Sequence, residues 1–134
     1  MLKLTPVLLA GMLAMIPQAA SAAEISTHVL DLARGVGGQG VPVTLSKKLP
    51  SGGWVLVARA STDGKGRVGA FASSHHMGTG IYKLHFDMSR YPQTGTTTPF
   101  FPEIEVAFQV SDPGAHYHVP VVVSPYGYST YRGN

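Results

Sequence analysis

The chain has 134 residues, of which 16 are glycine and 10 are proline, and only 13% are charged. So many helix breakers argue against coiled coils and helical bundles, whereas 44% hydrophobic residues can form a packed core and exclude a disordered tail. The net charge of +3 comes from scattered side chains, which gives no indication of a nucleic-acid partner. We expect one compact domain.

Residues 1–22 differ in composition from the rest of the chain. Lys3 precedes an uncharged apolar run over residues 6–16, and residues 20–22 are the small side chains Ala-Ser-Ala. This order is typical of a cleaved secretory signal peptide, with a buried N-terminal helix as the alternative. The run is too short for a bilayer, which needs about 20 apolar residues, so we expect no membrane partner. The mature protein would then be an exported domain of residues 23–134.

The chain contains no cysteine, although exported proteins of this size are often stabilised by disulfides. Stability must therefore come from the hydrophobic core, or from a core extended by pairing with other copies. Thiol nucleophiles, thiolate zinc sites and cysteine redox chemistry are excluded. The six histidines are the first candidates for chemistry near neutral pH.

Apolar and polar residues alternate with period two in short segments separated by turns rich in Gly, Pro and Ser, which predicts strands. The predicted strands cover residues 25–31, 41–45, 54–60, 82–86, 103–110 and 116–124. Pro120 indicates that the last of these is an edge strand or has a gap in its ladder. The only predicted helix is a turn or two near Met88–Tyr91, ended by Pro92. About seven or eight short strands indicate an all-β sandwich.

His116 and His118 are two residues apart on a predicted strand, so both lie on the same face. His28 lies in the first predicted strand. If the two strands are neighbours, three imidazoles converge and could hold a metal ion or activate a water by general base catalysis. Taken alone, the His-x-His pattern favours a solvated pair at a sheet edge.

Arg67 ends the segment Asp-Gly-Lys-Gly-Arg over residues 63–67, whose glycines let the backbone reverse and aim one guanidinium. The planar guanidinium suits a flat anionic or carbonyl-rich ligand, although an arginine after a hairpin is usually a solvated charge. The C-terminal residues 126–134 carry three tyrosines and Arg132. Because fraying would expose these aromatics, we expect a docked tail, and docking across a subunit boundary would fit the missing disulfides.

Four segments together resemble the 5-hydroxyisourate hydrolase family, the transthyretin-like enzymes of urate breakdown. They are residues 26–31 (STHVLD), 63–67 (DGKGR), 116–120 (HYHVP) and 131–133 (YRG). The resemblance implies a transthyretin (prealbumin)-like β-sandwich of two four-stranded sheets with one short helix. It also implies a homotetramer, a dimer of dimers with the active sites at the interface between dimers. The exported form is similar to the periplasmic branch of the family in Gram-negative bacteria.

The resemblance further implies a reaction, the hydrolysis of the cyclic amide of 5-hydroxyisourate to 2-oxo-4-hydroxy-4-carboxy-5-ureidoimidazoline. His28, Arg67 and His118 would be catalytic. The residues expected to bind the substrate are His28, Arg67, His116, Tyr131, Arg132 and Asn134. The family's reaction requires no cofactor or metal, although the imidazoles of His28, His116 and His118 can take up zinc in some relatives. The family tail is Tyr-Arg-Gly-Ser, and Asn134 here lacks the hydroxyl of that serine.

Three other classes of function are compatible with the same sandwich. A non-catalytic transthyretin-like carrier would bind a small ligand in a channel, where a polar His28, Arg67 and His118 set has no evident role. A periplasmic zinc-binding protein or zinc hydrolase would use His28, His116 and His118. A structural adhesion-type sandwich would have no pocket, and changes to its histidines would have no effect.

Overall fold

The computed structural model describes residues 24–71 and 77–134, so the predicted signal peptide lies outside the described residues. The strands are β1 (Glu24–Asp31), β2 (Val36–Gly37), β3 (Pro42–Lys48), β4 (Trp54–Ser61), β5 (Arg67–Val68), β6 (Gly80–Asp87), β7 (Glu103–Val110), β8 (His116–Ser124) and β9 (Gly127–Thr130). The period-two pattern located all the longer strands to within a few residues. Within the described ranges, no helix has the length and apolar character needed to cross a membrane.

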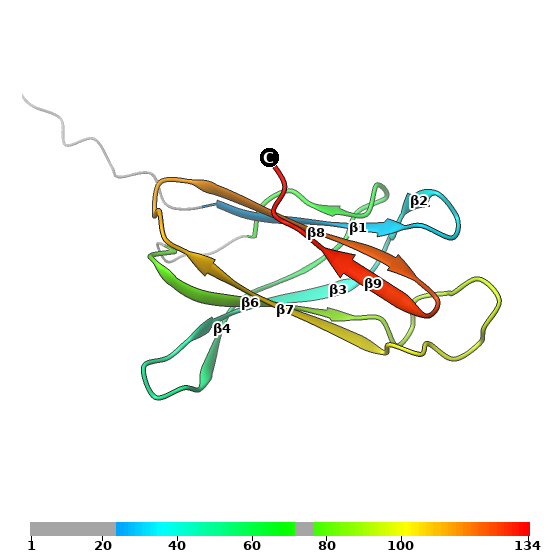
Figure 1. The fold of residues 1–134 in the computed structure, drawn as a ribbon, viewed down its shortest axis with the longest axis horizontal. Helices are drawn as coiled ribbons and strands as arrows, with labels where there is room; N and C mark the ends of the chain where they lie inside the picture. Colours follow the sequence, from blue (N-terminus) through cyan, green and yellow to red (C-terminus); the bar gives the residue numbers. More distant parts are fainter. Residues whose placement is uncertain (1–23, 72–76) are drawn as a thin grey trace, which may run out of the picture.

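The strands form two layers (Figure 1), which confirms the predicted β-sandwich. One sheet has the order β4-β3-β6-β7, and the other has the order β2-β1-β8-β9 with β5 also paired to β1. The two-residue strands β2 and β5 share the edge of β1 that β8 leaves free, since β2 pairs near Leu30 and β5 pairs near His28. The second sheet is therefore four strands wide, with its outer strand broken in two. Strands β1 and β8 are parallel to each other.

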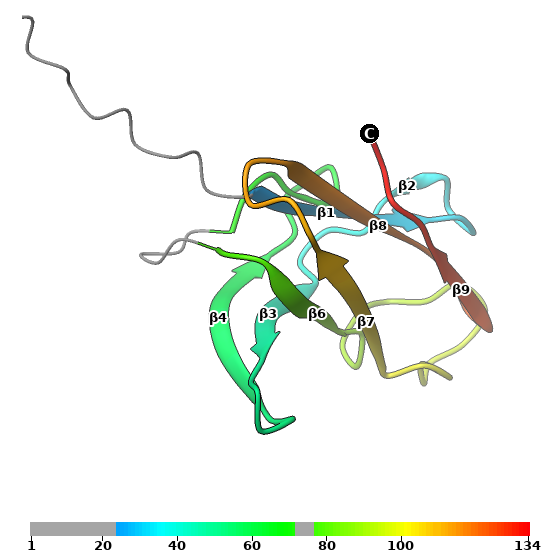
Figure 2. The same ribbon diagram turned by 60° about the vertical axis from the view of Figure 1, so that its left-hand side comes forward.

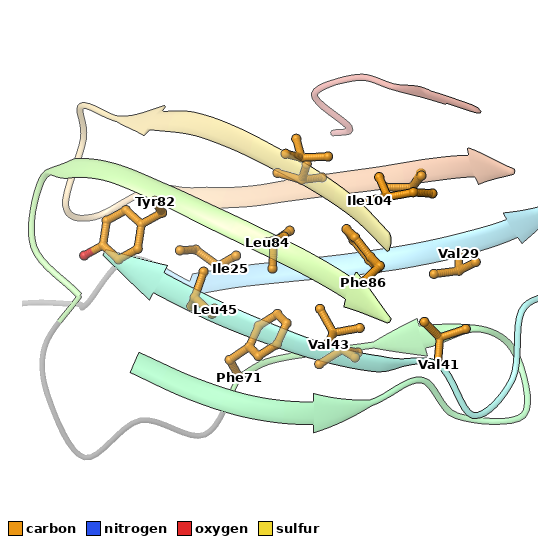
Figure 3. Packing of buried hydrophobic residues seen from close by; sticks show 14 of the residues in the cluster. Ile25, Val29, Val41, Val43, Leu45, Phe71, Tyr82, Leu84, Phe86 and Ile104 are labelled. Atoms are coloured by element: carbon orange, nitrogen blue, oxygen red, sulfur yellow. The ribbon is translucent and has the colours of Figure 1, made fainter. Parts of the chain in front are cut away.

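The core lies between the two sheets and is built from the inward-facing side chains of both (Figure 3). On β1, Ile25 and Val29 are fully buried, and Leu45 of β3 and Phe86 of β6 are buried from the other layer. The alternate residues of each strand face away from this core, because successive side chains point to opposite faces. The outer face of the β1–β8 sheet is thereby left for polar groups.

Asp31 anchors the end of β1 to the loop that follows β6. Its carboxylate accepts hydrogen bonds from the Tyr91 hydroxyl at 2.6 Å and from Arg34 Nε at 2.8 Å, and Arg34 also donates to the Tyr91 hydroxyl. Burial alone would raise the pKa of Asp31, but the hydrogen bonds from Tyr91 and Arg34 outweigh it and lower the pKa below its ordinary value. A buried carboxylate is thus kept ionised and paired where β1 ends.

The predicted helix near Met88–Tyr91 is wrong, because this segment forms a turn. The backbone N–H of Tyr91 donates to the Met88 carbonyl at 3.1 Å. The Asp87 carboxylate accepts hydrogen bonds from the backbone N–H and the hydroxyl of Ser89, at 3.0 and 2.6 Å. Such local side-chain bonds compete with a helical ladder, and Pro92 cannot continue one.

Pro120 marks a gap in a ladder rather than an edge strand, since β8 lies between β1 and β9. Pairing with β9 starts at Val121, opposite Thr130, immediately after the proline that has no N–H to donate. An isolated bridge between His118 and Gly133 then continues the same register. The tail therefore follows β8 after β9 ends, and in Figures 1 and 2 the C-terminus lies on the side of this sheet away from β3, β4, β6 and β7.

Candidate active site

Strand pairing gathers the predicted catalytic residues on the outer face of the β1–β8 sheet. The parallel register places Ser26 opposite His118, and the antiparallel register of β5 places Arg67 opposite His28. Residues that lie opposite each other in a ladder project from the same face. The intervening β1 residues are fully buried in the core, so Ser26 and His28 belong to the other, outer face.

The turn before β5 holds Arg67 at the edge of β1, as the glycine pattern predicted. The Asp63 carboxylate accepts hydrogen bonds from the backbone N–H groups of Lys65 and Arg67, both at 2.9 Å. Gly66 has φ of 78°, and a Cβ there would lie 2.4 Å from the Val29 carbonyl oxygen. Only glycine therefore allows the turn to close against β1 with Arg67 opposite His28.

His28 has a fixed ring orientation. Its Nε2 lies 2.8 Å from the Lys65 carbonyl oxygen. A carbonyl only accepts hydrogen bonds, so Nε2 must carry the hydrogen. In the neutral ring the lone pair is then on Nδ1, and the loop backbone sets the tautomer of His28.

His116 and His118 meet at the hydroxyl of Ser26. Ser26 Oγ lies 2.8 Å from His116 Nε2 and 2.8 Å from His118 Nδ1. Ser26 is only 4% exposed although it projects from the outer face, whereas His118 is half-buried and His116 is exposed. The two ring centroids are 6.4 Å apart. The spacing alone favoured a solvated pair at a sheet edge, but β8 is not an edge strand and only His116 of the two is exposed.

His118 is held in its neutral form. Burial is the main reason that its pKa lies below the ordinary value of 6.5, and the positive charges of Arg67, His116 and His28 lower that pKa further. An imidazole that is neutral at pH 7 has a lone pair to accept a proton. Among the histidines of this face, His118 thus has the electrostatics of a general base.

The C-terminal tail docks on β8, as predicted, and touches the histidine cluster through Gly133, although the three tail tyrosines that docking was expected to cover stay exposed within one subunit. The Gly133 N–H donates to the His118 carbonyl at 2.7 Å. A Cβ at Gly133 would lie 2.5 Å from Cδ2 of the His118 ring, so a larger residue would displace the imidazole. The tail therefore confines the His118 ring from one side.

Tyr131 and Arg132 lie away from the imidazoles. They line a cavity of about 240 Å³ between the β7 edge and the tail, and the Arg132 guanidinium stacks on the Tyr117 ring at 4.7 Å. Tyr131 is 54% exposed and Asn134 is exposed. Within one subunit, the structure thus brings His28, Arg67, His116 and His118 together and leaves Tyr131 and Arg132 outside this cluster.

A second, larger groove of about 740 Å³ opens beside His28 and Arg67. Its lining combines these two polar side chains with apolar groups of β1, β2 and β8. The residues that line it are His28, Leu30, Asp31, Leu32, Gly35, Val36, Gly37, Gly64, Lys65, Arg67 and Val122. A groove lined by apolar groups and a guanidinium fits a small, flat, polar molecule.

The suggested zinc set of His28, His116 and His118 does not fit this arrangement. In residues 24–71 and 77–134, no three His, Asp or Glu side chains are placed to hold a metal ion. One nitrogen of each ring is engaged, His28 Nε2 by the Lys65 carbonyl and the facing nitrogens of His116 and His118 by Ser26, and the described residues do not bring the remaining nitrogens together as a metal site.

Ser26 is the residue of this cluster that sequence reasoning missed. Its spacing of two from His28 places both on one face of β1, which was visible in the sequence. Contact with His116 and His118 depends on the parallel register of β1 and β8, which a single serine does not signal.

A model of one protein family matches residues 25–133, which is nearly the whole described chain. The chain belongs to the HIUase/Transthyretin family. A family member, the 5-hydroxyisourate hydrolase of Salmonella typhi, is 39% identical to it over 116 residues, covering 87% of this chain and 85% of that enzyme.

Solved structures of the HIUase/Transthyretin family have the same fold. The 5-hydroxyisourate hydrolase of Klebsiella pneumoniae has a TM-score of 0.70 and 28% identity, covering 84% of this chain and 99% of that chain. Transthyretin from Sparus aurata has a TM-score of 0.73 and 27% identity, and the match covers 81% of this chain and 95% of that transthyretin. The fold alone therefore does not distinguish an enzyme from a transthyretin, and the side chains of the site must do so.

Proposed function

We propose that this protein is a 5-hydroxyisourate hydrolase, a cyclic amide hydrolase that opens the N1–C6 bond of its substrate in urate breakdown. The observation that carries the proposal is a neutral, half-buried imidazole, His118, on the same face as Arg67 and His28. Curated relatives named 5-hydroxyisourate hydrolase, from Salmonella typhi and Mus musculus, are 39% and 34% identical over most of the chain.

His118 acts as the general base in this proposal. Its Nε2 removes a proton from a water molecule, and the water oxygen attacks the C6 carbonyl carbon. The C6 oxygen then gains negative charge, which the Arg67 guanidinium stabilises. Collapse of this intermediate breaks the C6–N1 bond, and the proton taken from water returns to N1. His118 suits the first step because burial and its cationic neighbours keep its pKa below the ordinary value.

The groove beside His28 and Arg67 supplies a place for the planar substrate. Arg67 can direct two parallel N–H groups toward carbonyl oxygens, and His28 presents a ring whose tautomer is fixed by the Lys65 carbonyl. Apolar side chains of the same groove would cover the ring faces. Tyr131 and Arg132 lie outside the histidine cluster of one subunit, and in this proposal they and Asn134 bind the substrate from the tail, next to Gly133, which confines His118.

The assembly is a homotetramer, a dimer of dimers, in this proposal. Strands β7 and β9 end their sheets, and an unpaired strand edge is a template for pairing with another chain. Leu32 and Val36 are 70% and 50% exposed beside the groove, which suits burial against a second dimer. Light scattering coupled to size exclusion tests this point, and a monomeric mass would contradict it.

Export to the periplasm is proposed from residues 1–22, which have the order of a signal peptide. Expression of the full chain in a Gram-negative host, followed by fractionation, should recover the protein in the periplasm. N-terminal sequencing should begin at Ala23. Cytoplasmic protein with an intact N-terminus would contradict the export proposal without affecting the catalytic one.

The deciding experiment generates 5-hydroxyisourate from urate with urate oxidase and follows its decay spectroscopically. Decay faster than the spontaneous rate supports the enzyme. A carrier would bind without accelerating decay, which is the outcome expected if this chain functioned as a transthyretin. Activity that survives chelation would agree with a reaction performed by His118 and Arg67 alone, whereas loss on chelation would favour a zinc enzyme.

A further inference from the structure

The hydroxyl of Ser26 is shared by two imidazoles, and this sharing limits their protonation. Ser26 Oγ contacts His116 Nε2 and His118 Nδ1, each at 2.8 Å. A serine hydroxyl has one hydrogen, so it can donate to only one of the two nitrogens. When it does, the other nitrogen must carry a hydrogen and donate to the oxygen. The tautomers of His116 and His118 are therefore coupled.

We propose that Ser26 is a positioning residue that keeps the Nε2 lone pair of His118 available and relays protons between His118 and His116. This inference rests on the proposed hydrolase function, in which His118 is the base. In the active arrangement His118 Nδ1–H donates to Ser26 Oγ, and the Ser26 O–H donates to His116 Nε2. Both rings then carry their hydrogen on Nδ1, and His118 Nε2 is free to accept a proton from water.

The relay is balanced in protons. After His118 Nε2 takes a proton from water, the ring is a cation. Its Nδ1 proton moves to Ser26 Oγ while the Ser26 hydroxyl proton moves to His116 Nε2, so one O–H bond breaks as another forms. The positive charge passes from half-buried His118 to exposed His116, where water solvates it. The reverse transfer returns a proton to His118 Nδ1 as Nε2 donates to the leaving nitrogen N1.

The charges around His118 favour this transfer. Strand β5 supplies Arg67, which is always charged, whereas His28 of β1 and His116 of β8 add positive charge only when they are protonated. Glu24, at the start of β1, lies opposite His116 in the register, so the carboxylate on this face is at the His116 end of the relay. Among the described residues, the ion pairs that form involve neither His116 nor His118. A proton on His118 is thus repelled by the Arg67 guanidinium and moves toward the end of the relay nearer a carboxylate.

Ring nitrogen shifts in the ¹⁵N NMR spectrum of the purified wild-type protein test the tautomers directly. Above the pH range in which the rings titrate, His116 and His118 should both carry the hydrogen on Nδ1, with Nε2 unprotonated. In Ser26→Ala the His118 ring should gain the Nε2–H tautomer. A wild-type His118 that carries its hydrogen on Nε2 would overturn the proposal, and this measurement requires no variant to fold.

Kinetics supply the second test. Ser26→Ala should lower kcat about 10- to 100-fold, less than the roughly 10²- to 10⁴-fold typical of an acid–base group because Ser26 acts through His118, with little change in KM. Ser26→Thr keeps the hydroxyl and should recover most of the loss. The matched control is Thr27→Val, which removes a neighbouring hydroxyl that donates to the Val119 carbonyl at 2.6 Å on the core side of β1.

Thr27→Val should lower the thermal unfolding temperature, because the buried Val119 carbonyl loses a hydrogen bond, and should leave the pH profile of kcat/KM unchanged. A folded Ser26→Ala protein with wild-type kcat and pH profile would overturn the relay. If wild-type protein fails to hydrolyse 5-hydroxyisourate, the function is wrong, whereas an active wild type with His118 as the Nε2–H tautomer shows that only the role of Ser26 is wrong.

Discussion

The two sheets each present histidine on an outer face, but the surroundings of these histidines differ. On the β6–β7 face, His85 Nε2 lies 3.0 Å from the Glu103 carboxylate, and Lys83 lies 3.4 Å from Glu105. On the β1–β8 face, His118 faces a hydroxyl and cations. The first face balances positive charge with carboxylates, as solvated surfaces do. On the second face, no ion pair within the part of the chain that the structure describes neutralises Arg67, which disfavours protonation of the half-buried His118 imidazole.

The largest expected difference between the faces is in catalysis. His118→Ala should lower kcat/KM for 5-hydroxyisourate by about 10²- to 10⁴-fold, because it removes the general base. His85→Ala should leave kcat/KM unchanged, since His85 belongs to the carboxylate-paired face. Circular dichroism and light scattering should show that both variants keep the wild-type fold and assembly. Full activity of His118→Ala would contradict the assignment of His118 as the general base of the β1–β8 face.

The next effect concerns the guanidinium of Arg67, which forms no ion pair with the carboxylates of residues 24–71 and 77–134. Arg67→Gln should lower kcat/KM by about 10²- to 10³-fold, as loss of a group that stabilises developing negative charge does. It should also raise the pKa of His118 part of the way toward its ordinary value, since Arg67 lowers that pKa more than any other charged group does, second only to burial. NMR titration of the His118 ring measures this shift. Lys83→Gln removes one positive charge from the other face and should change neither quantity.

The pH profile should report the lowered pKa of His118. Catalysis requires the neutral ring, so kcat/KM should fall as the pH drops through the pKa of His118 in the free enzyme. Because burial and cationic neighbours lower that pKa, the acid limb should lie below 6.5, the ordinary value for histidine. Raising the salt concentration should move the limb only slightly, because salt screens the charges but not the burial. An acid limb above 6.5 would contradict the assignment of His118 as the base.

The smallest effect is expected at the chain end. Asn134→Ser restores the hydroxyl of the family tail, and exposed Asn134 makes no hydrogen bond to His118 among the described residues. We expect kcat to rise by no more than about threefold, which corresponds to less than 1 kcal/mol. A rise of tenfold or more would place the hydroxyl in the reaction itself.

Much of this architecture could be read from local pattern. The alternation over residues 103–110 and 116–124 located β7 and β8 with the bounds that the structure has. The Asp63–Arg67 turn follows from its glycines and the capping carboxylate, which act within five residues. The predicted helix near Met88 failed because Asp87 and Ser89 form their own hydrogen bonds, a competition that spacing does not reveal.

The site divides in the same way. The sequence by itself determined that His116 and His118 share a face, and that Ser26 and His28 share another, because side chains alternate along any strand. Only the tertiary structure decided that the two pairs lie on the same face of one sheet. The β1–β8 register that brings them together pairs residues about 90 positions apart in the sequence. In the same register, His116 and His118 contact the Ser26 hydroxyl and do not form a zinc site with His28. Long-range pairing set the chemistry because proton transfer depends on which nitrogen faces which oxygen.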